Sequence, residues 1–287
     1  MKKLRLKRHG SFSIREGWFE KAIDSIREND KSVFSKASGV ATLGIGANMV
    51  TSLRFWMIAS EVITENNSMF TEFGDLLVEY DPYLESDFSW WMIHHNLVSN
   101  FENAPVFNIV FNHFNIKNFN KDIMNQFVIN YMEENGYDMS NSSLVDADTT
   151  VLLRTYINEK IKNPEDNLSC PLGKLGILMK NTDGSYNFIQ PNHETLPYEV
   201  VYYSLLKCID EDEIKGGINI DDLINKYNSP SRIFKLDKNL LHMYLNKMKQ
   251  AGLVTINKTA GLNMLYIQKI MSEKEIFDNF FMRSNNE

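Results

Sequence analysis

The residues with the clearest capacity for chemistry lie on one side of a helix expected in LDKNLLHMYLNKMKQAGLV, residues 236–254. At about 100° per residue, one side of this helix is an apolar stripe of Leu240, Leu241, Tyr244, Leu245 and Met248. The opposite stripe has no carboxylate and consists of Lys235, Asn239, His242, Asn246 and Lys249. A solvated helix face usually mixes both signs of charge, so this stripe favours contact with the phosphates and base edges of DNA. A neutral surface or a protein-docking face is the alternative interpretation.

A second segment, LGIGANMVTSLRFW from Leu43 onward, allows three interpretations. A dinucleotide phosphate cradle needs a third glycine and a preceding strand, but Met49 takes the third position and SKASGVAT shows no strand-like alternation. The glycines fit better as the tight turn of a helix-turn-helix, whose second helix would present Asn48, Thr51 and Arg54 to DNA with Ser52 on a flank. In the third interpretation Asn48 and Ser52 cap the helix and Arg54 pairs with an acidic neighbour. The sequence leaves the last two open.

Residues suited to catalysis or metal binding form no recognisable motif. His94 and His95 lie among aromatic residues in WWMIHHNL, a setting more typical of core or interface histidines than of metal ligands. Asp146 and Asp148 could pair as acids, but they have the position of a helix start. No metalloprotease motif, nucleophile elbow or kinase signature is present. We therefore expect no catalytic residue, no metal site and no cofactor, and an enzyme is the least favoured class.

The elements that must position these side chains repeat one outline at both ends of the chain. Near the N-terminus we expect a helix over residues 17–27, a short helix over 35–43, the glycine turn, a helix over 47–63, a ribbon over 62–70 and a helix capped by Thr71. Near the C-terminus we expect a helix over 197–209, a helix capped by Asn219, the polar-faced helix, and a two-stranded ribbon in LVTINKTAGLNMLYIQ. Both outlines are typical of winged helix-turn-helix units.

Helical periodicity also fills the middle of the chain. DPYLESDFSWWMIHHNLVSNF offers two helix starts, at Asp81-Pro82 and at Ser86-Asp87, and Asp183-Gly184 is a strong hairpin signal. The expected fold is therefore mainly α, with winged helix-turn-helix units at both ends joined by a helical middle region, and short β-ribbons as wings. The expected domains are residues 1–76, a winged-helix-like domain; 77–190, a helical domain with a hairpin; and 191–287, a winged-helix domain.

Composition limits the class of protein. Of 287 residues, 43% are hydrophobic and 23% charged, which is typical of a soluble globular protein. The net charge of −7 argues against a cationic nucleic-acid binder throughout, but a local basic face is compatible with it. Cys170 and Cys208 form no CxxC pair, and no apolar run reaches the ~18 residues of a membrane span. We expect a cytoplasmic protein without membrane contact.

Several unusual segments occur in a fixed order: HGSFSIREGWFEKAID, LGIGANMVTSLRFWMIA, DPYLESDFSWWMIHHNLVSN, FNHF and PLGKLGIL. Together they resemble the prokaryotic domain-of-unknown-function family DUF4007 over nearly the whole chain. The family pattern Gly-Val-Gly-x-Asn-Met-Val is matched by residues 44–50, whereas His-Glu-Thr-Phe becomes His9-Gly10-Ser11-Phe12, without the acidic residue. Family members tend to lie beside genes for DNA phosphorothioation and phage defence. The resemblance implies a DNA-handling or regulatory accessory protein and supplies no catalytic residue.

The leading hypothesis is a non-catalytic protein that binds double-stranded DNA for such a system, with recognition helices at 48–54 and 235–249 in major grooves. The alternative is an adaptor whose winged helices dock protein partners of the same locus, with Trp90 and Trp91 as candidate surface aromatics; a homodimer is possible in either case. Arg8 and Arg15 are expected to add phosphate contacts. The predicted DNA-binding residues are Lys36, Asn48, Thr51, Ser52, Arg54, Lys235, Lys238, Asn239, His242, Asn246, Lys249 and Lys258.

Overall fold

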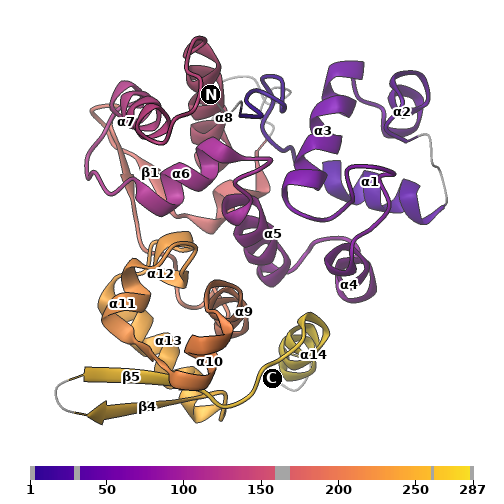
Figure 1. The fold of residues 1–287 in the computed structure, drawn as a ribbon. Helices are drawn as coiled ribbons and strands as arrows, with labels where there is room; N and C mark the ends of the chain where they lie inside the picture. Colours follow the sequence, from indigo (N-terminus) through magenta and orange to yellow (C-terminus); the bar gives the residue numbers. More distant parts are fainter. Residues whose placement is uncertain (1–3, 29–32, 159–168, 260–261, 285–287) are drawn as a thin grey trace. The chain divides into compact units, whose positions relative to one another are not determined.

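The computed structural model describes residues 4–28, 33–158, 169–259 and 262–284; the side chains of residues 36, 37, 258, 259, 262 and 284 lie outside this description. In these described ranges the chain is mainly helical with two small antiparallel sheets (Figure 1). It divides into two compact units, Met1–Ile189 and Gln190–Glu287. The residues expected to form domains 1–76 and 77–190 belong to the first unit, except Gln190, which begins the second.

The first unit contains eight α-helices in its described part, followed by a 3-10 turn and a short hairpin (Figure 1). Their bounds are α1 Trp18–Arg27, α2 Lys36–Leu43, α3 Ala47–Ala59, α4 Glu72–Tyr80, α5 Asp87–Ser99, α6 Pro105–His113, α7 Lys121–Glu134, α8 Ser143–Tyr156, η2 Pro171–Leu175, β1 Leu178–Lys180 and β2 Tyr186–Phe188.

Local signals set the boundaries of α2, α3 and α4. Ser35 caps α2 by accepting a bond from Ser38 N, and Gly44 ends it with φ at 65°, a conformation that glycine adopts without strain. Thr71 caps α4 as predicted, accepting a bond from Gly74 N at 3.0 Å. The expected wing over 62–70 is reduced to one isolated bridge, between Ile63 and Phe70, so this segment is a loop rather than an extended ribbon.

The helix expected to reach Ile63 ends four residues earlier, at Ala59. Glu61 adopts a positive φ of 62°, and the N–H groups of Val62 and Ile63 both donate to the carbonyl of Met57. The chain therefore turns away from the α3 axis immediately after Ser60, and this turn places residues 64–68 beside the helix.

Helix α5 forms the centre of the core of the first unit, because every residue from Phe88 to Val98 is buried. The expectation that Trp90 and Trp91 are surface aromatics is wrong: they are 7% and 0% exposed, and Trp90 Nε1 donates to the carbonyl of Leu84 at 2.9 Å. Of the two candidate starts, only Ser86 begins the helix. Asp81 instead accepts bonds from the backbone N–H groups of Glu85 and Ser86, which closes the preceding turn.

The second unit combines helices with a three-stranded sheet of order β3-β5-β4, whose neighbouring strands are antiparallel. Its elements are α9 Tyr198–Cys208, α10 Glu211–Gly216, β3 Ile218–Asn219, α11 Ile220–Asn225, α12 Pro230–Ile233, α13 Lys238–Gln250, β4 Val254–Thr259, β5 Leu262–Ile267 and α14 Glu273–Ser284 (Figure 1).

Helix α13 and the β4–β5 ribbon follow the sequence pattern closely. Asp237 caps α13 by accepting a bond from Leu240 N at 2.8 Å, and Gly252 with φ at 72° leads the chain into β4. The predicted apolar stripe faces the core through Leu241, Tyr244, Leu245 and Met248, whereas Leu240 is only half-buried. The opposite side of α13 is left facing outward.

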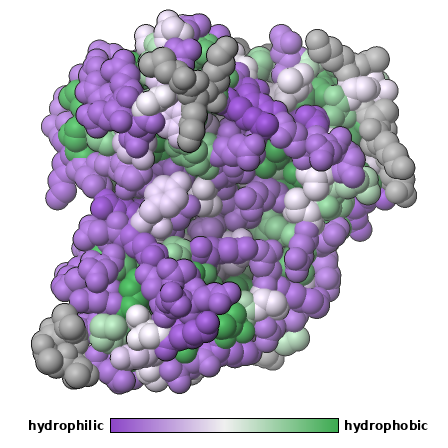
Figure 2. Space-filling model, in the orientation of Figure 1, coloured by the Kyte–Doolittle hydropathy of each residue, from purple (hydrophilic) through white to green (hydrophobic). Residues whose placement is uncertain are grey.

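The hairpin signal at Asp183-Gly184 joins β1 to β2, with Gly184 at φ 85°. None of the helices described in the structure is long and apolar enough to cross a membrane. Figure 2 shows a mainly hydrophilic surface on the face in view, with scattered hydrophobic patches.

Candidate nucleic-acid interface

The outward side of α13 and the β4–β5 ribbon enclose an open groove with a volume of about 690 Å³. Four of the predicted DNA-binding residues line it: Asn239, His242, Asn246 and Lys249 from α13. Ile256 of β4 and Asn263 of β5 complete the lining. The groove therefore brings together side chains from α13 and from the ribbon. The turn at Gly252 places these two elements side by side.

Polar side chains of this groove are available to a ligand. Within the described ranges, no hydrogen bond or ion pair engages the side chains of Asn239, His242, Asn246 or Lys249. Among the residues that the structure describes, the groove lining includes no carboxylate. The absence extends along the chain, because residues 238–272 contain five lysines and no Asp or Glu. An anionic ligand would meet no fixed negative charge on these elements.

Two other lysines predicted near α13 have different settings. Lys238 forms an ion pair with Asp221 at 2.5 Å. Lys235 precedes the helix instead of lying on it, with a positive φ of 55°. The pKa of Lys235 is lowered to about 7, mainly by burial and to a smaller extent by the nearby charge of Arg232. Placing Lys235 in the outward stripe of α13 is therefore wrong, because the stripe begins after it. Lys258 lies on β4, where its backbone pairs with that of Asn263 on β5.

The side chains predicted on α3 are divided between surface and interior. Asn48 and Thr51 are exposed, and Thr51 Oγ1 donates back to the carbonyl of Ala47 at 3.3 Å. Ser52 is 1% exposed and donates to the carbonyl of Phe12 at 3.5 Å. Because Ser52 is buried, it packs inside the first unit, and its predicted contact with DNA is wrong.

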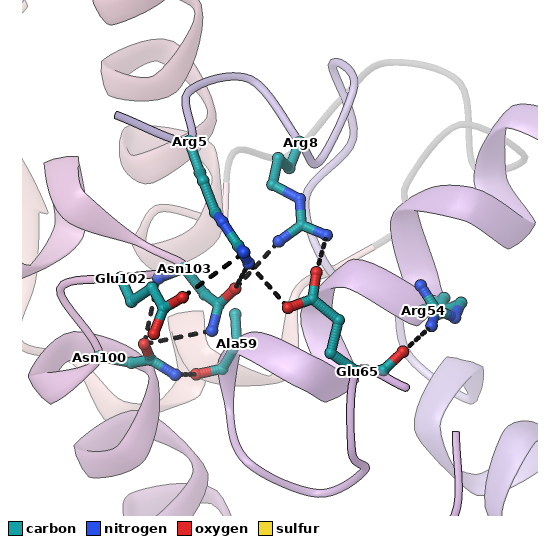
Figure 3. Close-up of polar contacts among 8 residues, drawn as sticks. All are labelled: Arg5, Arg8, Arg54, Ala59, Glu65, Asn100, Glu102 and Asn103. Atoms are coloured by element: carbon teal, nitrogen blue, oxygen red, sulfur yellow. Dashed lines mark hydrogen bonds and ion pairs between the residues drawn. The ribbon is translucent and has the colours of Figure 1, made fainter. Parts of the chain in front are cut away.

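Arg54 of α3 is used within the first unit. Its Nε donates to Ser68 Oγ at 2.9 Å. Its terminal nitrogen donates to the backbone carbonyl of Glu65, as Figure 3 shows. These bonds tie α3 to the loop that follows Ser60. In the third interpretation of the glycine segment, Asn48 and Ser52 cap the helix and Arg54 pairs with an acidic side chain. The structure differs on both points: α3 begins at Gly46 without a side-chain cap bond, and Arg54 is bound to a hydroxyl and a backbone carbonyl.

The N-terminal segment adds two arginines that share partners (Figure 3). Arg8 donates to Glu65 Oε1 at 2.9 Å and to Asn103 Oδ1 at 3.0 Å, while Arg5 donates to Glu65 Oε2 at 2.7 Å. These bonds hold the pKa of Glu65 below its usual range, and the bond from Arg5 has the largest effect. Arg8 therefore shares one carboxylate with Arg5 and is held by contacts within the first unit. The guanidinium of Arg15 lies over the rings of Phe12 and Trp18. The side chain of Lys36 lies outside the described part of the chain.

The comparisons with known proteins cover almost all of the chain. The family model "Protein of unknown function (DUF4007)" matches residues 6–281. The chain belongs to DUF4007. Two solved structures are similar to it, "Magnesium ion-bound SspB crystal structure" with a TM-score of 0.82 and "SspB crystal structure" with a TM-score of 0.81. Each is 20% identical over 98% of this chain and 89% of the other, a likeness that shows the shared fold. No curated protein matches the chain.

This DUF4007 chain buries the histidine of the family's N-terminal motif. His9 is 1% exposed, stacks on Trp56, and pairs through Nε2 with Asp148, which also accepts a bond from Lys7 N at 3.1 Å. Gly10, where the family pattern has an acidic residue, adopts a φ of 65° that favours glycine. Asp148 thus anchors the N-terminal segment to α8. Sequence reasoning did not predict this pairing, because the partners are 139 residues apart.

His94 and Cys170 of this DUF4007 chain are buried, whereas Asp146 is exposed and pairs with Lys121 at 2.7 Å. His94 Nδ1 lies 2.7 Å from Tyr156 Oη in the core, as expected of a core histidine. Burial raises the pKa of the Cys170 thiol to about 12, so the thiolate is not accessible near neutral pH. In the described residues, no three His, Cys, Asp or Glu side chains are grouped so that they could hold a metal ion.

Sequence reasoning did not predict that Ile256 and Asn263 line the groove, because the ribbon was expected only as a wing and none of its residues except Lys258 was considered for the site. A usable signal existed in the acid-free run of residues 238–272, which joins the helix and the ribbon into one surface of uniform sign.

Proposed function

We propose that this protein is a non-catalytic, double-stranded-DNA-binding accessory protein of a prokaryotic DNA-modification or phage-defence system. Its DNA-binding module would be the second unit, folded as a winged helix. The groove of α13 and the β4–β5 ribbon carries this proposal, because free amide, imidazole and ammonium groups gather there without a carboxylate.

The order of elements in the second unit supports a winged helix. Helices α9 and α10, strand β3, and helices α11, α12 and α13 are followed by the β4–β5 ribbon, and β3 joins the ribbon in one sheet. In helix-turn-helix modules the recognition helix enters the major groove, and α13, the helix directly before the ribbon, would take that role. Helix α13 has 13 residues, about 20 Å at 1.5 Å per residue, a suitable length for a major groove.

The first unit is a weaker candidate for contact with DNA. Its α1–α4 segment has the helix order of a helix-turn-helix, but residues 62–70 form a single bridge, Ser52 is buried, and Arg54 is bound to Ser68. We therefore assign recognition to α13. Family membership favours a role within a DNA-modification or defence locus, and protein partners from that locus are compatible with it.

The test is a fluorescence titration of the full chain with a labelled 24-base-pair duplex at several salt concentrations. The variant Lys249→Glu with His242→Glu should weaken binding at least about tenfold and flatten the salt dependence, because contacts to phosphates release counterions. The matched control is Lys215→Glu, which reverses an exposed lysine on α10 that pairs with Glu211. This control should bind as the unsubstituted protein does.

Two results would overturn the assignment. Equal affinity of the double variant and the control would remove α13 as the DNA surface. No binding by the unsubstituted chain at low salt would reject DNA binding altogether and favour the adaptor hypothesis, in which the same groove docks a protein.

A further inference from the structure

The groove orders its chemistry along the helix. Asn239, His242 and Asn246 are spaced by three and four residues, so they lie on one face at intervals of about 4.5 and 6 Å. Lys249 continues the row by one further turn. Three side chains that form directional hydrogen bonds are thus followed by one lysine.

This ordering suits base edges better than phosphates alone. A lysine only donates and binds phosphate as a point charge, whereas an asparagine amide donates and accepts at the same time. Adenine presents an acceptor at N7 beside a donor at N6 in the major groove, which an asparagine pairs in a bidentate manner. The groove has asparagines at two helix positions and a third, Asn263, on the ribbon.

Ile256 supplies the complementary apolar contact. It lies on β4 at the edge of the same groove and is partly exposed. Thymine is the base whose major-groove edge carries a methyl group. An A·T pair therefore offers both features that this lining would match, an amide-like edge on one base and an apolar group on the other.

The lining matches a G·C pair less well. Guanine is most often contacted by arginine, and cytosine N4 by a carboxylate, and neither residue type lines the groove among the described residues. Lys249 at the end of the row is the lining residue best suited to guanine, because a lysine can donate to both O6 and N7.

We propose that this groove recognises A·T pairs through the major groove, with Asn239 and Asn246 contacting adenine and Ile256 contacting the thymine methyl group. This inference rests on the proposed function of DNA binding by α13. It assigns base selectivity to the asparagines and general affinity to Lys249.

The experiment compares three 24-base-pair duplexes at one salt concentration. The first contains only A·T pairs, the second only G·C pairs and the third only I·C pairs. An I·C pair has the major-groove edge of G·C but lacks the minor-groove amino group of guanine, so it separates the two grooves. We expect the A·T duplex to bind about tenfold more tightly than both others. Replacing thymine by uracil, which removes only the methyl group, should weaken binding severalfold, and Ile256→Ala should abolish that difference.

Variants assign the roles. Asn239→Ala with Asn246→Ala should reduce the preference for A·T to within about twofold, and helix stability should be kept because alanine is a better helix former than asparagine. Lys249→Ala should weaken all duplexes equally and leave the preference intact. Circular dichroism and thermal unfolding would verify the fold of each variant.

The outcomes separate this inference from the proposed function. Binding to all duplexes with equal affinity, or an A·T preference that the I·C duplex shares, would overturn recognition through the major groove while DNA binding stands. A preference unchanged in the double asparagine variant would overturn the role of α13 amides. No binding to any duplex at low salt would overturn both proposals.

Discussion

At the residue scale, neighbours decide whether a polar side chain is available to a ligand. Arg54 and Lys249 have similar helical settings in the sequence, yet Arg54 is bound to Ser68 and the carbonyl of Glu65, whereas Lys249 lines an open groove. A half-buried guanidinium with two such bonds stabilises the fold, because removing it leaves acceptors without their donor.

Arg54→Ala should therefore lower the free energy of unfolding by about 1 to 2 kcal/mol and leave DNA affinity unchanged. Urea unfolding and the duplex titration would measure the two effects. Thr51→Ala, on the exposed side of the same helix, serves as the matched control and should change neither quantity by much. A loss of affinity in a stable Arg54→Ala protein would contradict the structural role of this arginine.

Lys235 predicts a pH dependence of stability. Its pKa is about 7 in the folded chain, below the ordinary value of 10.5, because burial disfavours its charged form. Between about pH 7 and 10.5 the unfolded chain binds more protons at this residue, so its contribution to stability rises with pH in this window. Lys235→Met should flatten that rise in pH-dependent urea unfolding, whereas Lys215→Met should preserve it. An unchanged slope in Lys235→Met would contradict burial of the ammonium group.

At the element scale, α13 combines a capped start with a surface free of acids. Asp237 is the last carboxylate before residues 238–272, and its side chain accepts the N–H of Leu240. Its pKa is lowered first by that backbone bond. One residue therefore both stabilises the helix and places a negative charge beside the proposed DNA surface.

Substitutions at Asp237 can separate these effects. Asp237→Asn keeps an acceptor for the cap, so we expect stability to change by only a few tenths of a kcal/mol and DNA affinity to rise. Asp237→Ala removes the cap and should cost about 1 kcal/mol of stability. Thermal unfolding and the duplex titration would distinguish the two variants. Weaker DNA binding by a fully folded Asp237→Asn protein would contradict the electrostatic role.

At the scale of the whole molecule, the chain consists of two compact units, and the net charge of −7 hides an uneven distribution. Residues 210–222 carry six acids, while residues 238–272 carry none. Local sign, and not the total, determines attraction to phosphates within about a Debye length.

Residues 190–287 produced alone should fold cooperatively and bind the duplex with the same salt slope as the full chain, because the groove is built only from this unit. Circular dichroism and the titration would check this prediction. Residues 1–189 are the control and should bind at least about tenfold more weakly. A folded 190–287 fragment that fails to bind would show that the first unit contributes to the interface.

The sequence by itself determined the types of most elements and many of their ends. Ser35, Gly44, Thr71 and Asp183-Gly184 act on backbone groups within a few residues, so their effects could be predicted without the fold. The apolar stripe of α13 likewise predicts which side of the helix faces outward, because the helical period of 3.6 residues places the polar residues opposite the apolar ones.

Only the tertiary structure decided which polar side chains remain available. Arg54 meets the loop after Ser60, His9 meets Asp148 across 139 residues, and α5 buries both tryptophans that the sequence suggested for the surface. The groove at Ile256 likewise required the ribbon to fold back beside α13. Local pattern fixes the face on which a side chain lies, but its burial and partners depend on segments distant in the chain that packing brings together.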